Sequence, residues 1–221
     1  MSMQSMLWPP ARPAVIFDFD GTLSDTAKIW HEVDRIFLGA RGIPLEDDYP
    51  LMLSTLGFVD GALYTIERYG LSDTVEDLHR EWSSISKRLY ARDARLRPGA
   101  EDYIRALKAQ GIPCALATTN DPNVLASIQH VDVEGLFDAC VHGSDVGCGK
   151  DRPDIFVEAA RRLGMAPEDC LVFEDIVPAI QSAQSVGMLT CGVRANDPLQ
   201  DLEGVQEIAD LWLDDWRDIT L

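Results

Sequence analysis

Five short apolar runs, separated by amphipathic stretches, constrain the fold of this chain of 221 residues most strongly. Each run has four or five residues bounded by turn-forming residues, as expected of strands buried on both faces. The runs are 14–17, 114–117, 139–142, 170–173 and 189–193. Helical patterns lie between them, for example over 99–110 and 154–163. This alternation predicts an α/β fold with a doubly wound, Rossmann-like parallel sheet, because parallel strands require crossover helices.

One long stretch, 27–96, breaks the alternation because it has helical patterns and no convincing strand. It is much longer than an ordinary connection in an α/β unit. We therefore predict an α/β core made of 1–26 and 97–221 and an inserted helical cap domain, 27–96, over one end of the sheet. The segments 24–28 and 93–99 are the predicted hinges between them.

Composition narrows the possible partners. The 19 basic and 37 acidic residues give a formal net charge of -18, which disfavours binding to nucleic acid or to anionic membranes. The apolar runs are far shorter than the roughly 20 residues of a membrane helix, so no membrane span is expected. The 5 cysteines are widely spaced without a CxxC motif and fit reduced thiols. We expect a cytoplasmic protein and, by default, a monomer.

Polar residues follow four consecutive predicted strands. They are Asp18 and Asp20 after the first, Thr119 and Asn120 after the second, Lys150 beyond the third, and Glu174 and Asp175 after the fourth. Alone, each motif has an ordinary explanation, as an acidic turn, a helix cap, a solvated lysine or surface charge. The carboxyl ends of parallel strands meet at one edge of a sheet, however, where ligands gather. Together the residues predict a site for a phosphate-sized anion, with a hard divalent cation between the carboxylates.

These motifs, in this order and spacing, resemble those of the haloacid dehalogenase superfamily. The likeness covers nearly the whole chain and is to the helical-cap phosphatases and the related β-phosphoglucomutase-like subfamily. The first motif is Asp18-Phe-Asp20-Gly-Thr22, the second ends at Thr119-Asn120, the third is Lys150, and the fourth is Glu174-Asp175. Three positions depart from the usual pattern of the family and concern the geometry of the loops, namely Asp151, Ile176 and Pro178.

The resemblance implies a role for each motif residue. Asp18 would be the nucleophile that forms an aspartyl-phosphate, and Asp20 the general acid and base. Mg²⁺ would be held by the Asp18 carboxylate, the Asp20 backbone carbonyl and Asp175, with Glu174 acting through a metal-bound water. The phosphoryl group would be bound by Thr119, Asn120 and Lys150. A covalent step of this kind divides one difficult displacement into two easier ones.

The expected activity is Mg²⁺-dependent hydrolysis of a small phosphomonoester, such as a sugar phosphate or phosphoglycolate. The alternative is a β-phosphoglucomutase-like phosphosugar isomerase, which needs a basic residue in a cap loop and a histidine early in the cap. Residues 51–60 contain no Lys or Arg, and Trp30 occupies the histidine position, so hydrolysis is favoured. Asp20 argues against a dehalogenase, and the filled catalytic positions argue against a binding module. Among the cap residues that could face substrate, Trp30 is the one we select.

Overall fold

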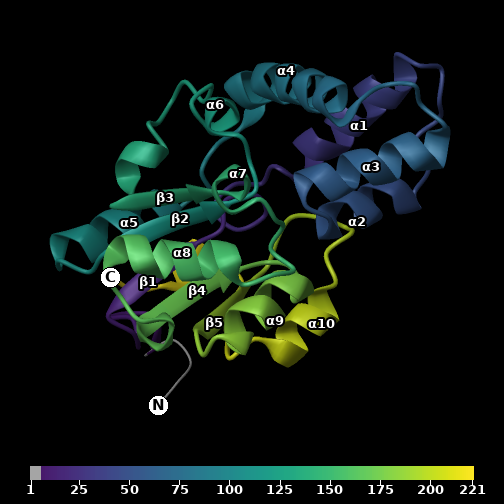
Figure 1. The fold of residues 1–221 in the computed structure, drawn as a ribbon. Helices are drawn as coiled ribbons and strands as arrows, with labels where there is room; N and C mark the ends of the chain where they lie inside the picture. Colours follow the sequence, from purple (N-terminus) through teal and green to yellow (C-terminus); the bar gives the residue numbers. More distant parts are fainter. Residues whose placement is uncertain (1–5) are drawn as a thin grey trace.

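The structure is a computed structural model that describes residues 6–221, apart from the side chains of residues 27, 51, 54 and 55. The first five residues of the predicted core domain therefore lie outside the described residues. A parallel sheet forms the centre of the molecule, and a group of helices covers one end of it (Figure 1).

Within residues 6–221 the sheet contains six strands in the order β3-β2-β1-β4-β5-β6, and every neighbouring pair is parallel. Their bounds are β1 Ala14–Phe17, β2 Cys114–Thr118, β3 Ala139–His142, β4 Cys170–Glu174, β5 Leu189–Val193 and β6 Leu211–Leu213. The central strands β1, β2 and β4 are buried along their whole length, which explains their continuous apolar runs.

Helices cover both faces of the sheet. Successive side chains of a strand point to opposite faces, so each strand packs against helices on both sides. Ala14 and Ile16 of β1 pack into one cluster with residues of α8 (Asp154–Leu163) and α9 (Val177–Ser185). Val15 and Phe17 pack into the other cluster, with α5 (Ala100–Ala109) and the short helix η4 (Trp216–Asp218). Shorter elements complete the core, namely α6 Pro122–Leu125, η2 Glu134–Leu136, α7 Gly143–Val146, η3 Pro167–Asp169 and α10 Leu202–Ile208.

Four consecutive helices follow β1 and form the group over the carboxyl ends of the strands (Figure 1). They are α1 Ala27–Gly39, α2 Asp48–Thr55, α3 Phe58–Tyr69 and α4 Val75–Asp93. Local signals set their ends: Gly70 ends α3 in the left-handed conformation, and Thr74 begins α4 with a capping box to Asp77. We call α1–α4 the cap.

The two segments that join the cap to the core lie side by side. Ser24 forms an antiparallel bridge with Leu96, and its hydroxyl donates to the carbonyl oxygen of Arg95 over 2.7 Å. The backbone nitrogen of Arg97 donates to the carbonyl oxygen of Leu23 over 2.8 Å. Cap and core are thus connected through one short paired segment.

The predicted fold class, an α/β protein with a parallel sheet and flanking helices, is confirmed. All five predicted strands are present, but the sixth, β6, was missed because three residues give too short a pattern. Pro178 is the second residue of α9, after Val177. The exact division into two domains stays a prediction.

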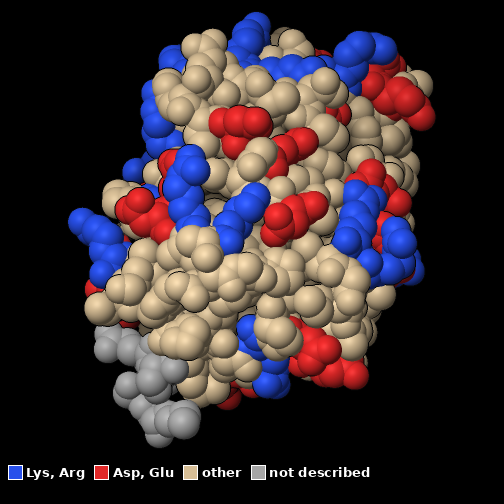
Figure 2. Space-filling model, turned by 90° about the vertical axis from the view of Figure 1, so that its left-hand side faces the viewer, with Lys and Arg blue, Asp and Glu red and all other residues tan. Residues whose placement is uncertain are grey.

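No helix among residues 6–221 is long and apolar enough to cross a membrane. On the face shown in Figure 2, acidic and basic side chains are interspersed. Many of the surface arginines pair with neighbouring carboxylates, as Arg161 does with Glu158. All five cysteines are free thiols.

Candidate active site

The strand order places the first and fourth motifs next to each other. β1 and β4 are neighbours in the middle of the sheet, and the chain order of the strands reverses between them. In an open α/β sheet, this reversal point at the carboxyl ends is where ligands bind. Asp18 follows the last residue of β1, and Glu174 is the last residue of β4.

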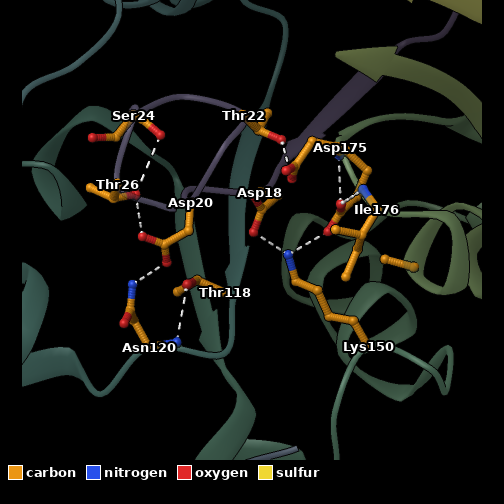
Figure 3. Close-up of polar contacts among 12 residues, drawn as sticks. Asp18, Asp20, Thr22, Ser24, Thr26, Thr118, Asn120, Lys150, Asp175 and Ile176 are labelled. Atoms are coloured by element: carbon orange, nitrogen blue, oxygen red, sulfur yellow. Dashed lines mark hydrogen bonds and ion pairs between the residues drawn. The ribbon is translucent and has the colours of Figure 1, made fainter. Parts of the chain in front are cut away.

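Lys150 connects these two strand ends (Figure 3). Its ammonium group donates to Oδ1 of Asp18 and, over 2.7 Å, to Oε1 of Glu174. All three side chains are buried, with exposed fractions of 5% for Lys150, 7% for Asp18 and 1% for Glu174. The hydroxyl of Ser182 in α9 donates to the Lys150 carbonyl oxygen over 2.6 Å and fixes the loop that carries the lysine.

The acid pair at the end of β4 is held by its own backbone. Oε2 of Glu174 accepts from the backbone nitrogens of Asp175 over 2.7 Å and Ile176 over 3.1 Å. Asp175 accepts from the Thr22 hydroxyl over 3.2 Å. Gly21 has a φ of +87°, and a Cβ atom there would overlap the Asp175 carboxylate. The glycine of the first motif therefore lets the loop after β1 approach the fourth motif.

Burial dominates the electrostatics of this cluster. It raises the pKa of Asp18 to about 8, against the opposing effect of the Lys150 ammonium. Burial also raises the pKa of Asp175 well above its usual value, and the nearby Glu174 and Asp18 add to this. Burial alone would lower the pKa of Lys150, but Asp18 and Glu174 outweigh it and raise the pKa. Three acids and one ammonium in a dry site favour the binding of further positive charge.

The donor set fits a hard divalent cation. Oxygens of Asp18, Glu174 and Asp175 lie within 4.8 Å of one another, and all three residues are buried. Oδ2 of Asp18 is buried and has no hydrogen-bond partner among the residues that the structure describes. Both oxygens of Glu174 accept from protein donors, so Asp18 and Asp175 offer the freer ligand atoms. Oxygen ligands from carboxylates are those that Mg²⁺ prefers.

The second acid of the first motif, Asp20, lies apart from this cluster and is surrounded by its own set of hydrogen-bond donors. The hydroxyl of Thr26 and the hydroxyl of Tyr90 both donate to Oδ1 of Asp20, and the Asn120 amide donates to Oδ2. Removal from water raises the pKa of Asp20, while these hydroxyl donors and the Trp30 indole lower it in part. Two carboxyl groups of one motif thus have different surroundings, as different roles require.

The loop after β2 presents the predicted phosphate ligands. Asn120 is buried, and Thr119 is exposed at the strand end. The backbone nitrogen of Asn120 donates to the Thr118 hydroxyl over 3.1 Å, and its carbonyl oxygen lies 2.9 Å from Nδ1 of the buried His142. Asp121, not Asn120, caps α6, since its side chain accepts from the Asn123 backbone nitrogen over 2.7 Å. Asn120 is thereby left to contact Asp20.

The structure places the predicted site residues in two groups at the strand ends. One contains Asp18, Lys150, Glu174 and Asp175, and the other contains Asp20 and Asn120. For the Thr119 side chain no hydrogen bond is found in the described part. Trp30 lies near the motif residues, where its ring meets Tyr90 edge-on with centroids 6.2 Å apart. Asp151 is exposed, and the ion pairs of Lys150 run to Asp18 and Glu174 instead. Asp151 therefore makes no ion pair with Lys150 in the described part of the chain.

Two residues that contact Asp20 were missed, Thr26 and Tyr90. Tyr90 belongs to α4 and is fully buried, so a helical pattern alone does not distinguish it from an ordinary core residue. Its hydroxyl reaches an acid 70 residues away in the sequence. Thr26 immediately precedes α1 at the N-cap position, but its side chain makes no capping hydrogen bond there.

These features define a hydrolase-like α/β core with an acidic site beneath a helical cap. Residues 13–187 match the family model described as haloacid dehalogenase-like hydrolase, so the chain belongs to this family. The family predicted from the motifs is confirmed, and with it an enzyme of the hydrolase class.

The curated relatives include named phosphatases. A phosphorylated carbohydrates phosphatase of Thermotoga maritima is 30% identical over 79% of this chain and 82% of its own length. A (DL)-glycerol-3-phosphatase of Arabidopsis thaliana is 34% identical over 89% of this chain and 84% of its own. Their names support hydrolysis of phosphoric monoesters of sugars or other small metabolites.

Among solved structures, CbbY of Rhodobacter sphaeroides in complex with phosphate superposes with a TM-score of 0.82. It is 25% identical and covers 94% of this chain and 96% of its own. A β-phosphoglucomutase of Clostridium difficile superposes with a TM-score of 0.76 at 22% identity, over 95% of this chain and 94% of its own. This second likeness shows the shared fold.

Proposed function

We propose that the protein is a Mg²⁺-dependent phosphatase that hydrolyses a small phosphomonoester through an aspartyl-phosphate on Asp18. The observation that carries the proposal is the buried arrangement of Asp18, Lys150 and Asp175, with an unpartnered oxygen on Asp18. A carboxylate and a cationic side chain at one point suit attack on an anionic phosphoryl group, because the ammonium offsets the repulsion between the two anions.

In the first step, a carboxylate oxygen of Asp18 attacks phosphorus while the bond from phosphorus to the ester oxygen breaks. Asp20 gives its proton to that oxygen, and the alcohol leaves. In the second step, Asp20 takes a proton from water as the water oxygen attacks phosphorus. The bond from phosphorus to Asp18 breaks, inorganic phosphate leaves, and both carboxyl groups return to their starting states.

The remaining motif residues bind and orient the phosphoryl group. Lys150 neutralises its oxygens, and Thr119 and Asn120 donate hydrogen bonds from the end of β2. Asp18, Asp175 and the backbone carbonyl of Asp20 would hold Mg²⁺, with Glu174 acting through a water. When bound, the ion would supply positive charge that offsets the negative charge on the oxygens of the transferring phosphoryl group.

The names of the relatives indicate which class of substrate to propose. Their names refer to phosphorylated carbohydrates, glycerol 3-phosphate and pseudouridine 5'-phosphate, which are all phosphate esters of polyols or sugars. We propose a substrate of this class. Hydrolysis is favoured over the mutase reaction because residues 51–60 of the cap contain no Lys or Arg to grip a second phosphate. A monomer in the cytoplasm remains our expectation.

The test is phosphate release from a panel of sugar, polyol and nucleoside monophosphates, with Mg²⁺ and with EDTA. We expect turnover of at least one ester with Mg²⁺ and none with EDTA. Asp18→Asn should remain folded by circular dichroism and lose turnover. Substantial phosphatase activity in Asp18→Asn would remove the nucleophile assignment, and formation of glucose 6-phosphate from β-glucose 1-phosphate would support the mutase instead.

A further inference from the structure

The hydrogen bonds to Asp20 come from both parts of the molecule. Asn120 belongs to the core and follows β2, whereas Tyr90 belongs to the cap and lies near the end of α4. Both donate to the Asp20 carboxylate, and the Asn120 amide also lies 3.3 Å from the Tyr90 hydroxyl oxygen. The three polar groups form a closed triangle in which Tyr90 is the contribution of the cap.

The Tyr90 ring is held in place by aromatic neighbours from both parts. Phe19, next to Asp20 in the core loop, stacks on it with centroids 6.4 Å apart. Trp30 of α1 meets it edge-on with centroids 6.2 Å apart. Tyr90 is fully buried, so its hydroxyl has no bulk water with which to exchange partners. A buried hydroxyl on a ring packed in this way fixes the direction of the bond that it makes.

The position of Tyr90 in the chain links this bond to the cap. Its carbonyl oxygen accepts from the backbone nitrogen of Ala94 over 3.1 Å, and Ala94 leads directly into the paired connecting segment. The phenol oxygen therefore moves with the last turn of α4. Any displacement of α4 from the core would separate the Tyr90 hydroxyl from the Asp20 carboxylate.

We propose that Tyr90 is a positioning residue that aligns the carboxyl group of Asp20 with the ester oxygen of the substrate, so that proton transfer requires the cap in place. The inference rests on the proposed phosphatase function and adds a residue to it. Tyr90 itself transfers no proton to substrate: Asp20 loses its proton to the leaving oxygen as the phosphorus–oxygen bond breaks, and Tyr90 keeps its own. A general acid depends on geometry, and its loss costs about 100-fold or more in rate.

The dependence on the leaving group provides the test. An alkyl phosphate needs its leaving oxygen protonated, whereas p-nitrophenolate leaves with little help. We expect Tyr90→Phe to lower kcat for glycerol 3-phosphate by about tenfold or more, and for p-nitrophenyl phosphate by less than about threefold, with KM changed little in both cases. Tyr103→Phe is the matched control, because it removes a buried hydroxyl that donates over 2.8 Å to the Leu7 carbonyl oxygen and not to Asp20.

A second comparison excludes a merely structural effect. If Tyr90 acts through Asp20, Tyr90→Phe should change the residual rate very little in an Asp20→Asn background. Equal losses on both phosphates, no loss on glycerol 3-phosphate, or a full further loss in the Asp20→Asn background would overturn the inference. Failure of the wild-type protein to hydrolyse any ester would instead refute the phosphatase function, and the role of Tyr90 with it.

Discussion

Gly57 of the cap and Gly149 of the core touch through their backbones, one residue before Lys150. A Cβ atom on Gly57 would lie 2.8 Å from the backbone nitrogen of Gly149, and one on Gly149 would lie 2.9 Å from the backbone nitrogen of Gly57. Gly57 begins α3 with an extended backbone and a φ of -68°, which any residue can adopt. The glycine is therefore needed for the close approach rather than for its conformational freedom.

Gly57→Ala should separate the cap from the loop that carries Lys150. We expect kcat/KM to fall about tenfold, because small displacements in a catalytic site are costly, and stability to fall by about 1–3 kcal/mol from overpacking. Gly39→Ala is the control, since a Cβ atom there meets nothing within 4 Å. Steady-state kinetics and urea unfolding measure both effects. Wild-type kinetics in Gly57→Ala would show that this contact does not matter for turnover.

Lys150→Met should destabilise the protein as well as inactivate it. The substitution leaves Asp18 and Glu174 buried without their shared cation, a loss of about 3–5 kcal/mol. The loss should be smaller at pH 5 than at pH 8, because buried carboxyl groups can then take up protons. Urea unfolding at both pH values gives the comparison. Lys108→Met, which removes an exposed pair with Asp138 at 3.5 Å, should cost less than about 1 kcal/mol.

Mg²⁺ should raise the melting temperature of the wild-type protein even without substrate. Binding to the folded state alone adds about 2.7 kcal/mol at a hundred times the dissociation constant. Asp175→Asn should lose most of this gain, yet be more stable than wild type in EDTA near pH 7. The reason is that burial raises the pKa of Asp175, so its charged form opposes folding. Thermal scans of wild type, Asp175→Asn and the exposed control Glu207→Gln test both expectations. If Mg²⁺ raised the melting temperature of Asp175→Asn as much as that of wild type, Asp175 would be excluded as a ligand.

Asp34 in α1 should make stability depend on pH without any ligand. Burial raises the pKa of Asp34 from 3.8 to about 7. Its contribution to stability is therefore full below about pH 4 and disappears as the pH rises through about 7. Asp34→Asn should match wild type near pH 4 and exceed it by on the order of 2–4 kcal/mol at pH 8. Unfolding free energies across this range test the difference, with the exposed Glu67→Gln as control; a constant difference would contradict the assignment.

The core strands and the residues that follow them could be predicted because each signal is local. The run 14–17 is apolar at every position since both faces of β1 are covered, and Asp18 follows it directly. The order and spacing of the four motifs then indicated the family. Neither the order of the strands nor the contact between Lys150 and Glu174 can be predicted from any single segment, because both depend on packing across the whole sheet.

The missed features depend on distant partners or on short segments. Tyr90 occupies a buried helical position like that of Trp82, and only the folded chain shows that its hydroxyl meets Asp20. β6 consists of Leu211–Leu213 at the edge of the sheet, and it pairs only with β5. Three residues are too few to establish a strand period. The approach of Gly57 to Gly149 likewise joins two loops that no sequence pattern connects.

The central place of β1 has a consequence for biosynthesis. β1 needs β2 on one side and β4 on the other, and the nucleophile that follows it is made 132 positions before its cationic partner Lys150. At ordinary ribosomal speeds this interval lasts roughly 7–26 s. Throughout that time the apolar strand β1 has no partner on its β4 side, and an unpaired apolar strand of this kind exposes a nascent chain to aggregation.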